Sequence, residues 1–338
     1  MNKMIGIEEL MADKDSWQII DVRSPAEFEA GHIPGALNLP VFTDEERARV
    51  GTLYKQVSPE SAMKEGFKIA GSKMTGFLEQ AASFPEERKL LIHCWRGGKR
   101  SEAMQWLFDF SGKPSSRLDG GYKSFRQLAH SFFNELPFDL KILGGFTGSG
   151  KTEILKEITA RGHQVIDLEK LAHHKGSAFG SVGEHEQPSN EQFENELFIA
   201  MFALDPHRPV WLENESKSIG KVYIPDGLWH KMKKAVLYSI EVNTDQRLDR
   251  IIEYYSNPST KDFLVEAFGK IRERLGGLEY KNAIYALNQN DLRSAAAIAL
   301  HYYDKSYTFQ INNWNKENII RLADCDGFQE TVNRLLSF

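Results

Sequence analysis

The chain has 338 residues, which is longer than one ordinary domain and sufficient for two. Hydrophobic residues make up 41% and charged residues 26%, with a net charge of -5; this balance is typical of globular proteins and excludes an overall basic, indiscriminate nucleic-acid binder. No apolar run reaches about 18 residues, so we expect no membrane segment. The two cysteines are too few for a disulfide-built fold and predict a cytoplasmic protein.

The first part of the chain alternates between apolar runs and helical patterns. Residues 17–22 and 90–92 are short apolar runs typical of buried strands, whereas residues 42–87 are mostly helical by pattern. Ser24 followed by Pro25 has the order expected at a capped helix start. Strands that alternate with helices predict a parallel sheet with helices on both faces.

The second part repeats this alternation after a candidate domain boundary. The boundary lies within residues 134–138, which divides the chain into domains 1–136 and 137–338. From about Thr244 onward the pattern is mainly helical. The expected strands of this domain are 139–143, 164–168, 209–213, 235–242 and a short one near 319–322. We therefore predict an α/β protein of two domains, the second with a helical tail.

Residues 89–101 place a cysteine between a strand and a helix. Cys94 ends the apolar run, and the cations and the helix N-terminus that follow it favour the thiolate over the thiol. Five residues separate Cys94 from Arg100, and their backbone N–H groups form a cup for a tetrahedral oxyanion. The alternative is a buried structural thiol, against which the cations argue; Cys325, between two aspartates, is expected to be inert. The predicted catalytic residues and cup glycines are Cys94, Arg96, Gly97, Gly98, Lys99 and Arg100.

The second strong motif is a glycine-rich loop that ends in Lys151 and Thr152. It follows an apolar strand and precedes a helix, as a P-loop does. Its N–H groups can bind a diphosphate or triphosphate, Lys151 can reach the terminal phosphate, and Thr152 can hold Mg²⁺. The alternative is a glycine-rich turn with a chance lysine, against which the flanking elements argue. The predicted diphosphate-binding residues are Gly145, Gly148, Ser149, Gly150, Lys151 and Thr152.

Carboxylates follow two further strands of this domain. Glu213 and Glu215 stand where P-loop proteins keep a second acidic site, so they are candidates for a Mg²⁺ ligand or a base; an ordinary polar strand end is the alternative. Asp167 and Glu169 either position a substrate or are solvated. The histidines in residues 173–180 lack a zinc-ligand spacing, and we expect this loop to contact phosphate or substrate instead.

The first domain resembles the rhodanese domain over residues 5–135. The resemblance rests on residues 20–28, 31–36, 94–101 and 119–121. One departure is the loop after the cysteine, which has five residues before the arginine where many sulfur-transferring rhodaneses have four. A loop of this length is similar to the His-Cys-x5-Arg loop of tyrosine phosphatases, so we expect it to accept a whole phosphate.

A rhodanese domain joined to a P-loop domain resembles the tRNA 2-selenouridine synthase family. Residues 167–169, 174–180, 213–216 and 302–304 also resemble that family. The resemblance implies a transferase that acts on 2-thiouridine at the wobble position of tRNAs for Lys, Glu and Gln. It implies that geranyl diphosphate first donates a geranyl group to sulfur, and that selenium from selenophosphate then replaces the geranylthio group.

The resemblance also implies co-substrates and partners. These are geranyl diphosphate, selenophosphate with the protein that supplies it, and tRNA, with Mg²⁺ but no tightly bound cofactor; we expect a monomer. The P-loop would hold the leaving diphosphate. Cys94 would attack selenophosphate to form a selenenyl sulfide, while Arg96 and the neighbouring cations bind the phosphate released. The aromatic candidates for a groove that binds the geranyl tail are Phe179, Phe198, Phe202, Trp211 and Trp229.

Two other functions are compatible with the residues. In one, Cys94 hydrolyses a phosphoester and the P-loop domain phosphorylates a small substrate, giving a phosphatase–kinase fusion. In the other, the first domain only docks partners, although the intact cysteine and its cations argue against that role.

Overall fold

The computed structural model describes residues 3–180, 184–255, 261–312, 314–322 and 327–338. The chain folds into two compact units. The first comprises Met1–Phe132 with Glu194–Glu196, and the second comprises Phe133–Phe193 with Leu197–Phe338. Each unit has its own sheet and its own hydrophobic core. No helix among the described residues is long and apolar enough to cross a membrane.

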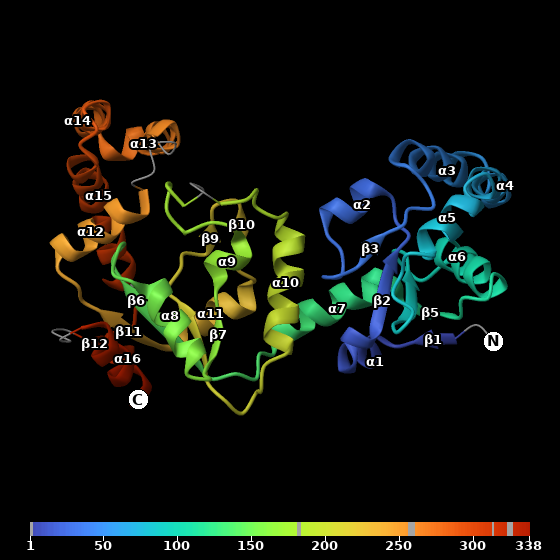
Figure 1. Cartoon of the computed structure of the whole chain (residues 1–338), viewed down its shortest axis with the longest axis horizontal. Helices are drawn as coiled ribbons and strands as arrows, with labels where there is room; N and C mark the ends of the chain where they lie inside the picture. The colour runs from blue at the N-terminus through green and yellow to red at the C-terminus, as the bar shows by residue number, and fades with distance from the viewer. Residues whose placement is uncertain (1–2, 181–183, 256–260, 313, 323–326) are drawn as a thin grey trace. The chain divides into compact units, whose positions relative to one another are not determined.

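The first unit contains a five-stranded parallel sheet (Figure 1). Its order is β1-β5-β4-β2-β3, so β4 is the middle strand. All residues of β2 and all but the first of β4 are buried, as expected for strands covered by helices on both faces. The strands are β1 (Lys3–Ile5), β2 (Trp17–Asp21), β3 (Leu37–Asn38), β4 (Lys89–His93) and β5 (Ser115–Leu118).

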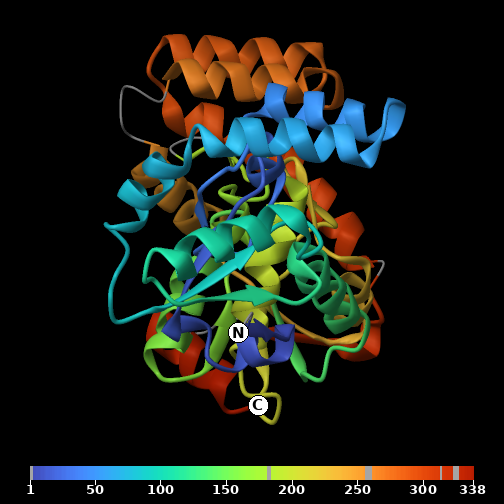
Figure 2. The ribbon, with the colours of Figure 1, turned by 90° about the vertical axis from the view of Figure 1, so that its right-hand side faces the viewer.

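The helices of the first unit begin where their sequences supply caps. In α2, the Ser24 side chain and Glu27 form the two halves of a capping box, and Thr43 with Glu46 does the same for α3. The helices α3 and α4 pack side by side (Figure 2). The helices are α1 (Ile7–Ala12), α2 (Pro25–Ala30), α3 (Asp44–Gln56), α4 (Pro59–Gly71), α5 (Met74–Ala81), α6 (Lys99–Phe110) and α7 (Gly121–Asn134).

The second unit is built on another five-stranded parallel sheet, with β6 in the middle. Its order is β12-β11-β6-β8-β7, and a short antiparallel pair, β9 and β10, lies outside it. Trp211 on β8 and Tyr238 on β11 belong to the core that this sheet shares with α8 and α16. The strands are β6 (Leu140–Gly145), β7 (Gln164–Ile166), β8 (Val210–Glu213), β9 (Ser218–Ile219), β10 (Val222–Tyr223), β11 (Val236–Ile240) and β12 (Ile319–Leu322).

A helical subassembly extends the second unit between β11 and β12. α13, α14 and α15 pack successively against one another, and α12 packs against α15 (Figure 1). Phe268 and Leu287 belong to its own hydrophobic core, separate from that of the sheet. The helices of this unit are α8 (Lys151–Ala160), α9 (Leu168–Ala172), α10 (Asn190–Phe202), α11 (Asp226–Lys234), α12 (Thr244–Tyr255), α13 (Lys261–Leu275), α14 (Gly277–Asn288), α15 (Leu292–Asn312) and α16 (Phe328–Leu336).

The predicted fold class is confirmed, and the differences are local. The strand expected over residues 164–168 ends at Ile166, because Asp167 accepts a hydrogen bond from Lys170 N (2.8 Å) and caps α9. The helix expected from Ser101 begins at Lys99. The prediction about Cys325 lies outside the described residues.

Candidate functional site

Cys94 lies at the carboxyl end of the middle strand of the first sheet. β4 ends at His93, and α6 begins at Lys99 with Gly98 as its N-cap, so the intervening backbone forms the predicted loop. The N–H groups in the first turn of a helix have no partners within the helix, and the helix dipole makes this end partially positive. The structure therefore places Cys94, which is 4% exposed, at a helix N-terminus.

Two glycines allow the chain to pack tightly around this loop. Gly97 has φ +67°, and a Cβ there would lie 2.9 Å from Leu118 O. Gly121 has φ +62°, and its Cβ would lie 2.5 Å from Gly97 N and closer still to Cys94 O. Both the left-handed backbone and the close approach exclude a side chain. The 119–121 turn thus closes the back of the loop, and Tyr122 N donates to Cys94 O (2.9 Å).

Ser101 is a site residue that the predicted set omitted. Its Oγ lies 3.4 Å from Cys94 Sγ and donates to Gly98 O (2.9 Å). A single hydroxyl proton serves one acceptor at a time, so ionisation of Cys94 would draw the Ser101 hydroxyl towards the sulfur. The signal was present in the sequence, because Ser101 lies in the first turn of the helix that begins beside Cys94.

The three predicted cations occupy different environments. Arg96 is exposed, and Lys99 is exposed and paired with Glu102 (2.9 Å). Arg100 is largely buried and donates to both oxygens of Glu27, at 2.5 and 3.1 Å. No sequence signal connected Glu27 to Arg100, whereas in the structure Glu27 both caps α2 and fixes the Arg100 guanidinium.

The Glu27 carboxylate is stabilised by this pairing. Burial alone would raise the pKa of Glu27, but hydrogen bonds from Arg100, the charge of Arg100 and the Ser24 N–H outweigh burial and lower that pKa to about 2. Arg100 therefore remains oriented by a charged partner at all physiological pH values.

A second buried ion pair lies beneath the Cys94 loop. Arg23 donates to Asp21 Oδ2 from Nε (2.9 Å) and Nη2 (2.6 Å), and its guanidinium stacks 3.9 Å from the centre of the Tyr122 ring. His93 Nε2 lies 3.8 Å from the same Asp21 oxygen. Burial lowers the pKa of His93 more strongly than the nearby Asp21 raises it, so the imidazole is neutral at physiological pH. These groups fix the end of β4 from which Cys94 projects.

The P-loop occupies the equivalent position in the second unit. It follows β6, the middle strand, and Gly150 (φ +85°) is the N-cap of α8. Lys151 Nζ donates to Gly145 O (3.0 Å), and Ser149 N donates to Phe146 O (3.0 Å). The Ser149 hydroxyl is buried and has no hydrogen-bond partner. The loop therefore has the turn and the lysine position expected of an anion site.

Two helices outside the motif hold the P-loop in place. Arg247 of α12 donates from Nε to Thr147 O (2.9 Å) and forms a two-point ion pair with Asp304 of α15, at 2.6 and 3.0 Å. Tyr307 of α15 accepts a hydrogen bond from Gly145 N. Asp304 carried part of the family resemblance, but no sequence signal connected Arg247 or Tyr307 to the P-loop.

The predicted acidic residues gather beside the P-loop strand. Glu213 ends β8, which pairs with β6, and accepts from Glu169 N (2.7 Å). The carboxyl groups of Glu169 and Glu215 interact through a hydrogen bond, with the charge of Lys151 close to both. Burial, followed by the charge of Glu169, raises the pKa of Glu215 to about 8. Burial also raises the pKa of Glu169. Burial together with the charges of Asp167, Glu169 and Glu215 raises the pKa of Glu213.

The Mg²⁺ role predicted for this site stays a prediction. Burial and neighbouring carboxyl groups raise the pKa of Glu213 and Glu215, whereas a bound Mg²⁺ would favour their ionised forms, and Asp167 caps α9. Across the described residues, no group of three or more His, Cys, Asp or Glu side chains is arranged to hold a metal. A P-loop Mg²⁺ would be held by the Thr152 hydroxyl and by phosphate oxygens of the ligand, which does not require such a group of side chains.

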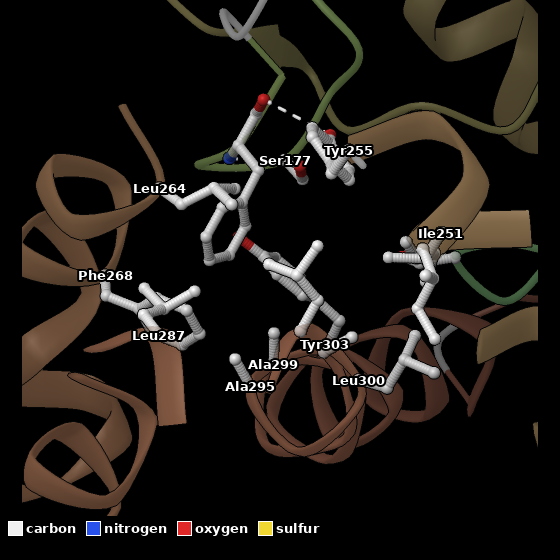
Figure 3. A pocket seen from close by; sticks show the side chains of 15 residues that line it. Ser177, Ile251, Tyr255, Leu264, Phe268, Leu287, Ala295, Ala299, Leu300 and Tyr303 are labelled. Carbon is white, nitrogen blue, oxygen red and sulfur yellow. Dashed lines mark hydrogen bonds between the residues drawn. The ribbon is translucent and has the colours of Figure 1, made fainter. Parts of the chain in front are cut away.

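An apolar cavity adjoins the P-loop within the second unit (Figure 3). Thr147 of the P-loop, together with Ser177 and Phe179 of the 173–180 loop, contributes to one part of its lining. The remaining lining comes from α12, α13, α14 and α15. Of the five aromatic residues proposed for a geranyl groove, only Phe179 lines this cavity.

The other four groove candidates lie elsewhere. Phe198 and Trp211 are fully buried core residues, Phe202 is 38% exposed, and Trp229 on α11 stacks under Lys233 (4.6 Å). Sequence pattern could not separate them, because an aromatic residue in a core and one in a groove have the same apolar signature. The lining of the cavity in Figure 3 consists largely of aliphatic and alanine side chains on helices that the sequence analysis treated as a tail.

Comparisons with known proteins assign both parts of the chain to described families. A family model described as the tRNA 2-selenouridine synthase AAA domain matches residues 138–335, and the rhodanese-like domain matches residues 7–128. A solved structure of a rhodanese-related protein from Thermoplasma volcanium covers 37% of this chain and 92% of its own, with 19% identity and a TM-score of 0.24.

Curated relatives match most of the chain. A tRNA 2-selenouridine synthase from Nitrosomonas europaea is 41% identical over 75% of this chain and 68% of its own length. Proteins of the same name from Hahella chejuensis and Aeromonas salmonicida are 33% and 31% identical; the matches cover 87% and 91% of this chain, and 85% and 91% of theirs.

The ion pair at the Cys94 loop predicts an acid-dependent loss of stability. Glu27→Gln should lower the free energy of unfolding at pH 7 by about 2 kcal/mol, because Arg100 loses a charged partner. Glu27 has a depressed folded pKa, so its contribution is complete above the unfolded pKa near 4.5 and is lost as the pH falls towards about 2. Urea titrations from pH 7 to pH 3 should show the difference shrinking. Glu29→Gln, exposed on the same helix, is the control; a constant difference at every pH would contradict this assignment.

The raised pKa of Glu215 predicts the opposite pH dependence of the free energy of unfolding. The folded protein retains a proton on Glu215 up to about pH 8, whereas the unfolded chain releases it near 4.5, so this group destabilises the fold as pH rises through that window. Glu215→Gln should therefore become more stable relative to the unmodified protein between pH 5 and pH 8, as measured by urea unfolding. Exposed Glu279→Gln should show no such trend. If the two variants behave alike, Glu215 is not protonated in the folded state.

Proposed function

The chain belongs to the tRNA 2-selenouridine synthase family, and from that premise we propose that it converts 2-thiouridine in tRNA to 2-selenouridine in two steps. The first step attaches a geranyl group from geranyl diphosphate to the thiouridine sulfur, and the second replaces the geranylthio group with selenium from selenophosphate. The proposed tRNAs are those for Lys, Glu and Gln, modified at the wobble position. We further propose a cytoplasmic monomer that receives selenophosphate from a separate supplier protein.

One observation supports this proposal: each unit has a loop at a helix start that is suited to binding an anion, and the first of these loops holds a cysteine. In each unit the middle strand of a parallel sheet ends in a loop of backbone N–H groups at a helix start. The first loop holds the Cys94 thiol, and the second holds Lys151 beside an apolar cavity. A reaction with one apolar diphosphate and one small phosphorus donor uses both sites.

In the first step the P-loop would bind the diphosphate of geranyl diphosphate. The thiouridine sulfur attacks C1 of the geranyl group, and the C1–O bond breaks with its electron pair on the diphosphate. Loop N–H groups and Lys151 stabilise the charge that develops on that leaving group. The uridine N3 proton must also leave. Glu215 lies beside Lys151 and has a pKa raised to about 8, so its ionised form, present as the pH approaches 8, is the candidate proton acceptor.

In the second step Cys94 would take selenium from selenophosphate. Sγ forms a bond to selenium, and the selenium–phosphorus bond breaks with its electron pair on phosphorus, which leaves as phosphite. The resulting selenenyl sulfide attacks C2 of the uridine and expels geranylthiolate. Two cellular thiols then supply the two electrons that reduce the sulfur–selenium bond. The first attacks Cys94 Sγ, releases the 2-selenouridine and forms a mixed disulfide, and the second frees Cys94 as the two thiols leave as a disulfide. The loop N–H groups and Arg100, which Glu27 orients, bind the phosphorus group.

The length of the Cys94 loop favours a second candidate chemistry for this step. Five residues between Cys94 and Arg100 suit a whole phosphate. In this route Sγ attacks phosphorus, hydrogen selenide leaves and attacks C2 of the uridine, and water releases phosphate from Cys94. This route changes no oxidation state, so it needs no thiol reductant. The phosphorus product distinguishes the routes, since attack on selenium gives phosphite and attack on phosphorus gives phosphate.

Removal of the P-loop lysine should separate the two steps. Lys151→Ala should slow formation of S-geranyl-2-thiouridine by about 100-fold or more, because the leaving diphosphate loses a positive charge. The same variant should still convert RNA that already carries the geranyl group. Nucleoside mass spectrometry after digestion measures both products. Lys156→Ala, exposed on the same helix, is the matched control. Loss of both steps, or of neither, would contradict the division between the loops.

Removal of the cysteine should block only the second step. Cys94→Ala should accumulate S-geranyl-2-thiouridine and make no 2-selenouridine, because no thiolate remains to accept a group from selenophosphate. Cys325→Ala is the matched control and should retain both activities. Detection of 2-selenouridine from the Cys94→Ala protein would rule out covalent catalysis by this residue.

A further inference from the structure

The apolar cavity of the second unit adjoins the P-loop. The space among the lining residues that protein atoms leave unfilled is about 560 Å³, a volume that includes solvent at the open mouth. Thr147 is both a P-loop residue and part of the cavity wall. A ligand that used the two features together would need an anionic head and an apolar tail.

The helix that holds the P-loop also forms the cavity wall. Arg247 of α12 donates to Thr147 O, and one turn later Ile251 and Ile252 line the cavity. α12 lies against the loop itself, because a Cβ on Gly148 would be 3.1 Å from Ile251 Cδ1. The distance between an anion in the loop and a chain in the cavity is therefore fixed by one rigid element.

The hydroxyl groups of the two tyrosines that line the cavity form hydrogen bonds with backbone atoms. Tyr255 donates from its hydroxyl to Phe179 O (3.4 Å), and the Tyr303 hydroxyl accepts from Ala178 N (2.8 Å). Their rings therefore line the cavity with their hydroxyls already engaged (Figure 3). The cavity therefore provides apolar surface that a hydrocarbon chain can contact, with few polar groups around it.

The far side of the cavity is lined by small residues. Ala295 and Ala299, one turn apart on α15, lie across the cavity from Ser177 (Figure 3). Larger side chains at these positions would fill part of the space. Ala297, between them in sequence, is exposed and does not line the cavity.

We propose that this cavity binds the hydrocarbon chain of an allylic diphosphate whose diphosphate occupies the P-loop, and that Ala295 and Ala299 set the length of chain accepted. The proposal rests on the proposed geranyl transfer for its reaction, but it assigns a binding site and a chain-length determinant that the reaction alone does not specify. An isoprenoid fits because the lining is aliphatic and aromatic, and the head group must be a phosphate because the adjoining loop binds anions.

The test compares chain lengths in the full-length protein. Unmodified protein, Ala299→Leu and the control Ala297→Leu are each assayed for transfer to thiolated tRNA from dimethylallyl, geranyl and farnesyl diphosphates. Ala299→Leu should lower the ratio of kcat/KM for geranyl over dimethylallyl diphosphate at least tenfold, because the longer chain loses space. Ala297→Leu should leave that ratio unchanged. A folded Ala299→Leu protein with an unchanged ratio would overturn the assignment.

A reverse variant covers the case in which Ala299→Leu does not fold. Leu287→Ala, on the opposing helix α14, enlarges the same cavity and should increase transfer from farnesyl diphosphate at least tenfold relative to geranyl diphosphate. No change in that ratio for the folded variant would also overturn the proposal.

A binding measurement separates failure of this proposal from failure of geranyl transfer. Calorimetry compares the unreactive analogue geranyl thiodiphosphate with inorganic diphosphate on the same three proteins. The analogue should bind the unmodified protein at least tenfold more tightly, and Ala299→Leu but not Ala297→Leu should remove that gain. This result supports the cavity even if no geranyl transfer is observed. Equal affinity for both probes in the unmodified protein would overturn the cavity assignment even if transfer occurs.

Discussion

Arg247 links the P-loop of the second unit to the apolar cavity beside it. Its guanidinium joins the P-loop carbonyl of Thr147 to Asp304, while its helix continues into the wall of the apolar cavity. The charge of Arg247 is 3% exposed and fully paired, so its position is determined by the fold rather than by solvent. The P-loop and the apolar cavity are thereby held in a fixed arrangement, as the proposed substrate with a charged head and an apolar tail requires.

In the first unit, the Cys94 loop depends instead on two positions that have no room for a side chain. Gly97 and Gly121 allow backbone to approach the Cys94 loop from behind, so that the N–H groups of the loop are left for a ligand. The two ion pairs near this loop have different structural roles. Arg100 is oriented by Glu27, whereas the Arg23–Asp21 pair fixes the strand end beneath Cys94. The middle strand of each sheet thus ends in one of the two loops, with Cys94 in the first loop and the cavity beside the second.

The sequence predicted what depends on local pattern. The alternation of apolar runs with helical segments gave both sheets, and the motif spacing located both loops at the ends of the correct strands, β4 and β6. It also placed Glu213 and Glu215 beside the P-loop strand, because the order of strands in this class of fold brings β8 next to β6.

Interactions between residues distant in sequence were not predictable. Glu27 and Arg100 are 73 positions apart, and Thr147 and Arg247 are 100 apart, so no spacing rule connects them. The cavity was missed for a related reason: alanines such as Ala295 and Ala299 look like ordinary helix formers, and only packing shows that their small size leaves space. Large aromatic residues were the obvious groove candidates in the sequence, yet Trp211 fills the core of the sheet.

The central claim is that alkylation in the second unit precedes and enables selenation at Cys94. A rapid-quench time course with unmodified protein, thiolated tRNA and both co-substrates tests this order by nucleoside mass spectrometry. We predict that S-geranyl-2-thiouridine rises first, that 2-selenouridine appears after a lag as the geranylated nucleoside declines, and that omission of geranyl diphosphate abolishes both. Formation of 2-selenouridine without a lag, or without geranyl diphosphate, would contradict this claim.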